Sequence, residues 1–239
     1  MWSQDECRQF FSRVFGLDLL DAESDSIYEF LSTNTATAMP RHGSPNAGLS
    51  PNVLQTFVHA ATERTGLTLE HGRFKKVREE ILPAAHFAIL LRKLGYGSFL
   101  LVPDDMPNPD ISLVKIDSSL GPNTTHLDAL PLEMMYAHSH ALASARGESE
   151  AEKIANAIIE IKFFNRYWPQ TILIVTLLTA ISDADIGTIA ALLPSGDGNP
   201  FHQVWLCFAR DRRAAVLAMV SPQLEMHDLT VDDLREYSY

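Results

Sequence analysis

The chain has 239 residues, of which 46% are hydrophobic and 21% are charged. This balance is typical of a globular domain with its own core and excludes collagen-like, coiled-coil and mucin-like proteins. The formal net charge of −11 has the wrong sign for a protein that holds nucleic acid through a broad basic face. Two cysteines are too few for a disulfide framework or a zinc cluster, and they fit a reducing compartment.

The charge is unevenly distributed. Residues 1–40 carry a net charge of −5 and residues 224–239 carry −4, so the other 183 residues together hold only −2. Residues 70–96 are basic, with six Lys or Arg against three Glu, which is most simply the solvated face of a helix. No apolar run approaches the roughly 20 residues that cross a bilayer, and the first residues lack the pattern of a secretory signal. We therefore expect an intracellular protein, cytoplasmic or nuclear, without a membrane association.

The first 52 residues differ from the rest. Apolar side chains at helical spacing predict helices within residues 5–31. Residues 32–52 contain three prolines and two glycines and read as a linker, with a mobile flap or a substrate-covering segment as alternatives. A helix is expected over 50–64, with Ser50 as its N-cap. We accordingly divide the chain into a helical extension with a linker, 1–52, and a domain, 53–239.

A longer helix is predicted over 73–94, because its apolar residues recur on one face. Pro83 should kink or divide this helix, and Gly95 is suited to end it. Short strands are expected at 98–102 and 111–116, followed by a loop at 117–132.

The second half alternates between predicted helices and strands. We expect helices at 132–145, 150–156, 169–181 and 183–193, and strands at 157–164, 202–209 and 214–220, with a turn at 194–200. Helices lead and strands cluster later with helices between them, which predicts an α+β or mixed α/β domain.

Three residues on two of these strands could carry chemistry. Asp110 follows Pro109 at the start of one strand, and Glu160 and Lys162 stand two apart on another. Residues two apart on a strand share a face, so Glu160 and Lys162 would project together while Ile161 packs inward. Two carboxylates suit Mg²⁺ or Mn²⁺, and a lysine beside them can assist an attacking water. An exposed ion pair on an edge strand is the simpler alternative.

A further carboxylate is available on the predicted helix 73–94. Glu80 flanks the apolar face of this helix and could reach the sheet, whereas Glu79 points to the opposite side and should meet water. An ordinary amphipathic helix without a site accounts for Glu80 equally well.

The order of helix acid, Pro-Asp strand, Glu-x-Lys strand and apolar helix resembles the PD-(D/E)XK nuclease superfamily, and most closely the fungal PD-(D/E)XK nuclease-like domain proteins. The motif residues are Ile158-Ile-Glu-Ile-Lys162, followed by Gln170, and the resemblance covers about residues 75–220. It implies a restriction-endonuclease-like mixed sheet flanked by helices. It also implies that Asp110 and Glu160 bind the metal, Lys162 is the catalytic lysine, Glu80 is the helix acid and Gln170 supports the site.

Alternatives remain for individual positions. Asp110 and Glu160 are 50 residues apart, so Asp117 and Asp128 are substitutes for Asp110. A second metal site could be built from three histidines, His126, His138 and His140, together with Glu133.

The sequence thus predicts a Mg²⁺- or Mn²⁺-dependent phosphodiester hydrolase. The alternatives are a non-nuclease of the same fold, either a small-molecule enzyme of specialised metabolism or a catalytically degenerate binding or interaction protein. Nucleic acid, if bound, should be held weakly and in a salt-sensitive way, because both ends of the chain are acidic.

Overall fold

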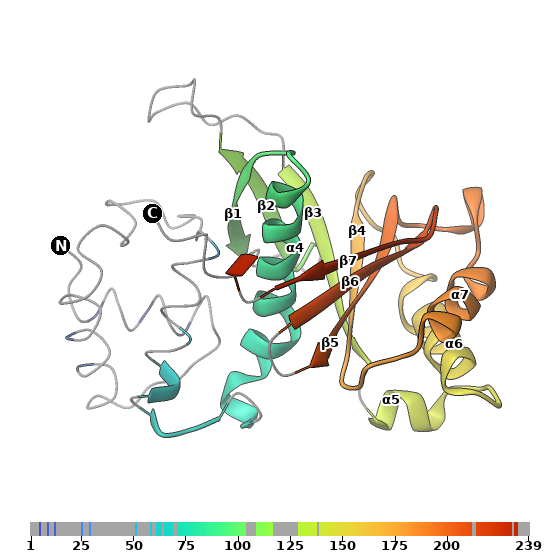
Figure 1. Ribbon diagram of the computed structural model, residues 1–239, viewed down its shortest axis with the longest axis horizontal. Coiled ribbons are helices and arrows are strands. Elements are labelled where there is room, and N and C mark those ends of the chain that lie inside the picture. The colour runs from blue at the N-terminus through green and yellow to red at the C-terminus, as the bar shows by residue number, and fades with distance from the viewer. Residues whose placement is uncertain are drawn as a thin grey trace.

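Figure 1 shows the computed structural model of the chain. The structure describes residues 71–103, 109–116, 129–137, 139–211, 214–230 and 232–233, together with separate positions before residue 69. The described positions within 5–31 are helical, as are Pro51, Val58 and Ala61, in agreement with the two predicted helices. Of the predicted linker at 32–52, only Pro51 is described. The substitutes Asp117 and Asp128 and the side chains of the three histidines also lie outside the described residues.

In the part of the chain that the structure describes, seven strands form a single mixed sheet in which the spatial order equals the chain order. They are β1 (Ser98–Pro103), β2 (Ile111–Ile116), β3 (Ala129–Ala137), β4 (Ile172–Leu177), β5 (Gln203–Asp211), β6 (Ala214–Ser221) and β7 (Glu225–Leu229). The first three strands pair antiparallel, β3, β4 and β5 pair parallel, and the last three pair antiparallel. The prediction of an α/β domain with a mixed sheet is therefore confirmed at this level.

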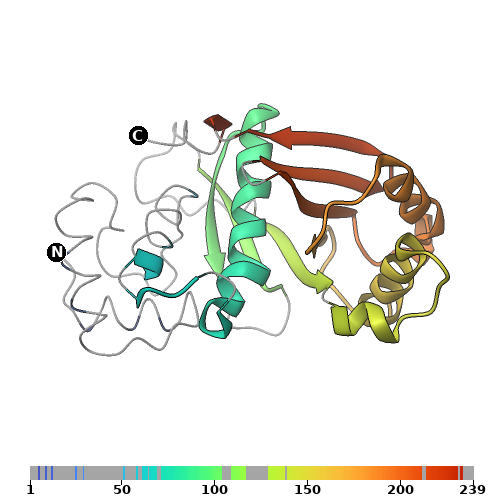
Figure 2. The ribbon, with the colours of Figure 1, turned by 60° about the horizontal axis from the view of Figure 1, so that its bottom comes forward.

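Helices cover both faces of the sheet, as Figures 1 and 2 show. They are η1 (Gly72–Phe74), the π-helical turn η2 (Val77–Ile81), α4 (Leu82–Lys93), α5 (Ser139–Ser144), α6 (Glu150–Lys162), α7 (Asp183–Leu192) and η3 (Gly196–Gly198). One apolar cluster joins α4 to one face, and a second joins α6 and α7 to the other. Successive side chains of β3 point to opposite faces of the sheet, so Met134 belongs to the first cluster and Met135 to the second.

The helix predicted over 73–94 is confirmed together with its irregularity. Pro83 lies in the first turn of α4, where a missing N–H costs nothing, and the π-helical turn η2 precedes it. At the other end, Gly95 adopts a φ of 84° and its N–H donates to the Arg92 carbonyl, while the Tyr96 N–H donates to the Leu91 carbonyl. These two bonds form a Schellman motif, which fixes where α4 ends and β1 begins.

The strand predicted over 157–164 is wrong, because these residues continue α6. Ser149 and Glu152 form a capping box that starts the helix. Ala151, Ile154 and Ile158 then recur at helical spacing and are buried. The β-branched side chains favour a strand locally, but the buried face that they build at helical spacing outweighs that preference.

Two further segments were assigned to the wrong class. Residues 132–137, expected to be helical, belong to β3, and the helix expected over 169–181 is the strand β4. Both strands lie inside the sheet and are buried on both faces, so they read as continuous apolar runs without alternation. Such a run does not distinguish a strand from a buried helix. The edge strand β7 was not predicted at all.

The remaining predicted elements are confirmed. Strands at 98–102, 111–116, 202–209 and 214–220 correspond to β1, β2, β5 and β6, and the helix at 183–193 corresponds to α7. Within the described parts of the chain, no helix is long and apolar enough to cross a membrane.

Candidate functional site

The position of α6 separates Glu160 from Lys162. Residues two apart on a helix point about 200° apart, so the two side chains do not share a face. Glu160 is exposed on the outer side of α6, and Ile161 is 46% exposed rather than packed in the core. The predicted pairing of Glu160 with Lys162 is therefore wrong, and so is the inward position of Ile161.

Lys162 instead reaches from the last turn of α6 to Glu133 on β3. Its Nζ donates to Glu133 Oε1 at 2.5 Å, and the two side chains are only 14% and 6% exposed. Glu133 alternates with Leu132 and Met134, which pack towards α4, so its side chain points to the face that α6 covers. A glutamate on a strand and a lysine on the following helix thus form one partly buried ion pair.

Asp110 brackets Glu133 from the neighbouring strand. The Asp110 N–H donates to the Leu132 carbonyl at 3.0 Å, and Asp110 Oδ2 accepts from the Met134 N–H at 2.7 Å. These bonds engage the residues immediately before and after Glu133. The Asp110 carboxylate is therefore fixed beside the Glu133 backbone, and its proximity raises the pKa of the Glu133 carboxyl.

Glu80 on η2 belongs to the same electrostatic group, because the charges of Asp110 and Lys162 act on it. Burial raises the pKa of Glu80, and the Asp110 charge raises it further, whereas Lys76 and Lys162 act in the opposite direction. The prediction that Glu79 meets water is wrong, because its side chain is only 16% exposed and pairs with Arg78 at 3.0 Å. Of the residues predicted for the site, the structure thus brings together Glu80, Asp110 and Lys162.

Burial is also the main reason that the pKa of Glu133 is raised. The hydrogen bond and the charge of Lys162 lower it in part, and the Asp110 charge raises it. The charge of Asp110 thus raises the pKa of both Glu80 and Glu133, with the partly buried Lys162 as the cation that acts against it, and an additional cation would stabilise this arrangement.

Gln170 belongs to a different part of the molecule. It lies in the turn before β4 with a φ of 67°, and it lines a cavity of about 530 Å³. This cavity adjoins the α4 face and is floored by Phe99, Trp205 and Met219. Neither Glu133 nor Lys162 lines it, so the structure does not bring Gln170 to the carboxylates.

The ligand atoms available around Glu133 are carboxylate oxygens, which Mg²⁺ and Mn²⁺ prefer. Asp110 and Glu133 supply hard carboxylate oxygens, and Mg²⁺ is often bound by only one or two carboxylates, with water and substrate phosphate completing its shell. Asp110 Oδ2 is engaged by the Met134 N–H, which leaves Oδ1 as the oxygen that can face a ligand. Among the residues that the structure describes, no three His, Cys, Asp or Glu side chains group tightly enough to hold a metal without such additional ligands.

Glu133 is the site residue that the sequence analysis did not assign to this group. It appeared there only beside the histidines, because a helix was expected over 132–145. The signal that could have identified it is a single acid, Leu132-Glu-Met-Met135, inside an apolar run. A charge in such a run is costly unless it is paired or functional. In a Glu-x-Lys motif a lysine follows the glutamate by two residues. Here Met135 occupies that position, so the motif does not mark Glu133.

Comparisons with protein-family models, with curated proteins and with solved structures found no match.

Proposed function

We propose that the chain is a divalent-metal-dependent phosphodiester hydrolase, with Asp110 and Glu133 as the metal-binding carboxylates and Lys162 as the catalytic lysine. The observation that carries the proposal is the bracketed pair Asp110–Glu133 with Lys162 donating to Glu133 at 2.5 Å. It keeps the assignment of Asp110 and Lys162 made from the sequence and replaces Glu160 with Glu133.

The order of elements supports the same proposal. An acid on a helix, Glu80, is followed by the Pro-Asp strand β2, the glutamate strand β3, the helix α6 and the strand β4. This order resembles that of the PD-(D/E)XK nucleases, with the lysine supplied by α6 in place of the motif strand. The resemblance is part of the proposal, and it depends on Pro109-Asp110 and on the position of Glu133.

Each residue has a defined task in this proposal. A bound divalent ion would polarise the phosphoryl oxygen and lower the pKa of a coordinated water. Lys162 places its positive charge where negative charge develops on the phosphoryl oxygens. Glu80, whose pKa is raised by burial, would be the general base that accepts a proton from the attacking water.

Metal binding tests the proposal directly. Titration of the protein with Mn²⁺, followed by calorimetry, should give binding that is lost in Glu133→Gln and in Asp110→Asn. Glu160→Gln is the matched control, because Glu160 is exposed on the outer face of α6, and it should bind Mn²⁺ as the parent does. Loss of binding in Glu160→Gln with retention in Glu133→Gln would contradict the assignment.

Activity on a simple substrate provides the second readout. We expect hydrolysis of bis-(p-nitrophenyl) phosphate in the presence of Mn²⁺ and its loss, by about 100-fold or more, in Lys162→Met. A protein that folds and binds Mn²⁺ through Glu133 but cleaves no phosphodiester would contradict the hydrolase and leave a binding function.

The cavity of about 530 Å³ favours a second candidate, a small-molecule function on the same fold. Its aromatic and aliphatic floor and its polar rim are typical of a ligand site. Met219→Trp should fill it. If the protein is a phosphodiesterase acting at Glu133, this substitution leaves cleavage of the model substrate unchanged. If it removes the activity while Mn²⁺ binding persists, the small-molecule candidate is favoured.

A further inference from the structure

The segment that follows Lys162 carries four aromatic residues within six positions. Phe163 and Tyr167 turn inward and pack on Phe201, with ring centroids 5.7 and 4.4 Å away. Phe164 and Trp168 turn outward and are 81% and 61% exposed. Two aromatic rings therefore anchor the segment while two others are presented to solvent.

Hydrogen bonds define the shape of this segment. Asn165 Nδ2 donates to the Ile161 carbonyl and to the Tyr167 hydroxyl, each at 3.3 Å. The Trp168 carbonyl accepts from both the N–H and the hydroxyl of Thr171, at 3.2 and 2.7 Å. The outward rings thus project from a backbone that is held at both ends, so little conformational entropy is lost when a ligand stacks on them.

The segment lies beside the Asp110–Glu133 site. It begins at Lys162, whose Nζ contacts Glu133. Burial raises the pKa of the Tyr167 hydroxyl, Asn165 acts against this, and the charges of Glu133 and Asp110 raise it further. Tyr167 is therefore within electrostatic reach of both carboxylates, so the segment that carries Phe164 and Trp168 begins and is anchored near the site.

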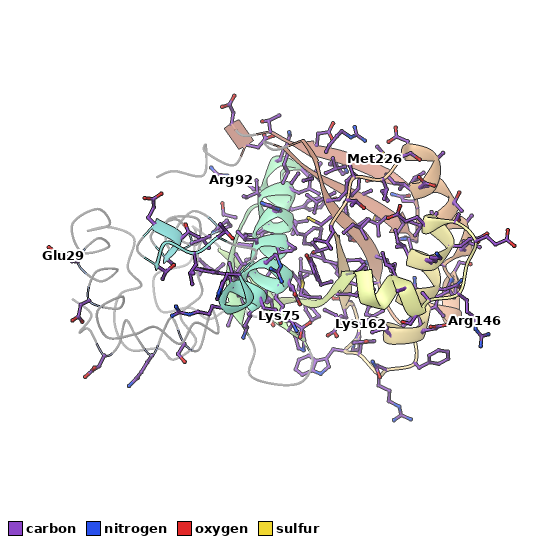
Figure 3. All side chains as sticks on the ribbon, turned by 90° about the horizontal axis from the view of Figure 1, so that it is seen from below. Glu29, Lys75, Arg92, Arg146, Lys162 and Met226 are labelled. Atoms are coloured by element: carbon purple, nitrogen blue, oxygen red, sulfur yellow. The ribbon has the colours of Figure 1, made fainter. Side chains whose placement is uncertain are left out.

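The charge of the segment is opposite to that of the whole chain. There is no Asp or Glu between Glu160 and Asp183, whereas Lys162 and Arg166 fall among the aromatic residues. The turn around Lys75 is also basic, with Arg73, Lys75 and Lys76. Figure 3 labels Lys75 and Lys162 on the same side of the molecule, and both Lys76 and Lys162 lower the pKa of Glu80.

We propose that Phe164 and Trp168 form a stacking platform for unpaired bases, so that the substrate of the site is a single-stranded nucleic acid. This inference rests on the proposed phosphodiesterase function. Every base offers a π-face to an aromatic side chain, but in a duplex those faces are already stacked on one another. Arg166 and Lys162 would contact phosphates of the strand whose bases lie on the platform.

The experiment measures binding of a fluorescein-labelled 15-nucleotide oligo(dT), and of a 15-base-pair duplex, by anisotropy at low salt with EDTA. We expect Phe164→Ala and Trp168→Ala each to weaken binding of the single strand by about fivefold or more and to change duplex binding little. Trp168→Phe should retain the affinity. Tyr96→Ala is the matched control, because Tyr96 is 60% exposed but lies at the end of α4, and it should change neither.

The outcomes separate this inference from the function on which it rests. Single-strand binding that weakens in both alanine variants, without any metal-dependent cleavage, supports the platform and overturns the hydrolase. If both variants cleave with the same preference between single strand and duplex as the parent, the platform is overturned and the hydrolase proposal stands. If the parent binds no oligonucleotide, or if Tyr96→Ala weakens binding as much as Trp168→Ala does, the platform is overturned, and Phe164 and Trp168 become a surface for a protein partner.

Discussion

Lys162 and Glu133 hold their charges almost out of water, with side chains only 14% and 6% exposed. At such a position the cost of desolvating two ions offsets much of their attraction, so the pair contributes little net stability. Removing one partner is different, because it leaves an uncompensated buried charge. Truncating Lys162 should lower stability whether its role is structural or catalytic, so a loss of stability alone does not identify the role.

The pH dependence of Lys162→Met is the first prediction. In the parent, burial raises the pKa of Glu133 and Lys162 counteracts this, so the substitution should raise that pKa further. An acid whose folded pKa lies above its unfolded value stabilises the fold only when it is protonated, and this stabilisation is lost as pH rises through the folded pKa. Guanidinium unfolding should therefore show a cost of about 3 kcal/mol at pH 8 and a smaller one at pH 5.

The double variant Glu133→Gln/Lys162→Met provides the control. It removes both charges, so its free energy of unfolding should lie above that of Lys162→Met at pH 8 and should lack the extra pH dependence. Equal costs for Lys162→Met at pH 5 and pH 8 would show that Glu133 does not bear the uncompensated charge.

His86 on α4 supplies the second prediction. Burial lowers the pKa of its imidazole from 6.5 to about 4. Between these two values the unfolded chain binds a proton that the fold excludes, so the free energy of unfolding falls as pH decreases from 6.5 towards 4. The contribution of His86 to this fall is at most about 3 kcal/mol. His86→Gln should flatten the curve relative to the parent over that window, and parallel curves would refute the explanation.

The elements of the first half were predictable because their signals are local. Pro83 and Gly95 bound α4 through the backbone conformations that these residues favour, and the short apolar runs that follow predict β1 and β2. Asp110 could be placed for the same reason, since Pro109-Asp110 marks the start of a strand. Lys162 was assigned to the site from its spacing to Glu160 and from the resemblance, although the element expected to carry it was wrong.

The second half could not be assigned from local signals. Between Glu150 and Leu177 the chain forms α6 and then β4, both rich in isoleucine; the helix predicted over 150–156 is the first half of α6, but the sequence pattern predicts a strand for its second half and a helix for β4. Their class depends on which neighbours bury them. The capping box at Ser149 favours a helix, and the parallel strands on both sides of β4 require an extended backbone. Glu133 was missed for the same reason, because its strand, β3, reads locally as a helix.

The third prediction concerns two glycines, Gly95 at the end of α4 and Gly187 within α7, whose backbone conformations differ. Gly95 has a φ of 84°, and no atom lies near the Cβ that alanine would add, so Gly95→Ala should cost about 1 kcal/mol through backbone strain alone. Gly187 lies within α7, also with open space around the added Cβ, and Gly187→Ala should stabilise by about 0.5–1 kcal/mol. Thermal unfolding should therefore shift in opposite directions, and a shift in the same direction would contradict the argument.

At the scale of the whole molecule, the acidic charge limits any binding of a polyanion. The net charge is −11, and residues 1–40 account for −5 of it. Positive charge near the proposed site comes from the basic turn around Lys75, from Lys162 and from Arg166. Long-range repulsion should therefore slow the encounter, while a few short-range contacts hold the strand.

The last prediction concerns the salt dependence of that binding. Only a few phosphates can be contacted, so the affinity should be weak even at low salt. The slope of log affinity against log salt should be negative, and binding should be lost by physiological ionic strength. Anisotropy of oligo(dT) at several salt concentrations measures this slope. Arg166→Ala should reduce this slope by about one ion, whereas Trp168→Ala should weaken binding without changing the slope, because stacking releases no counterion.

Deleting residues 1–40 should strengthen binding at low salt, with a circular dichroism spectrum confirming that the fold persists. Tight binding that does not respond to salt would contradict the electrostatic argument.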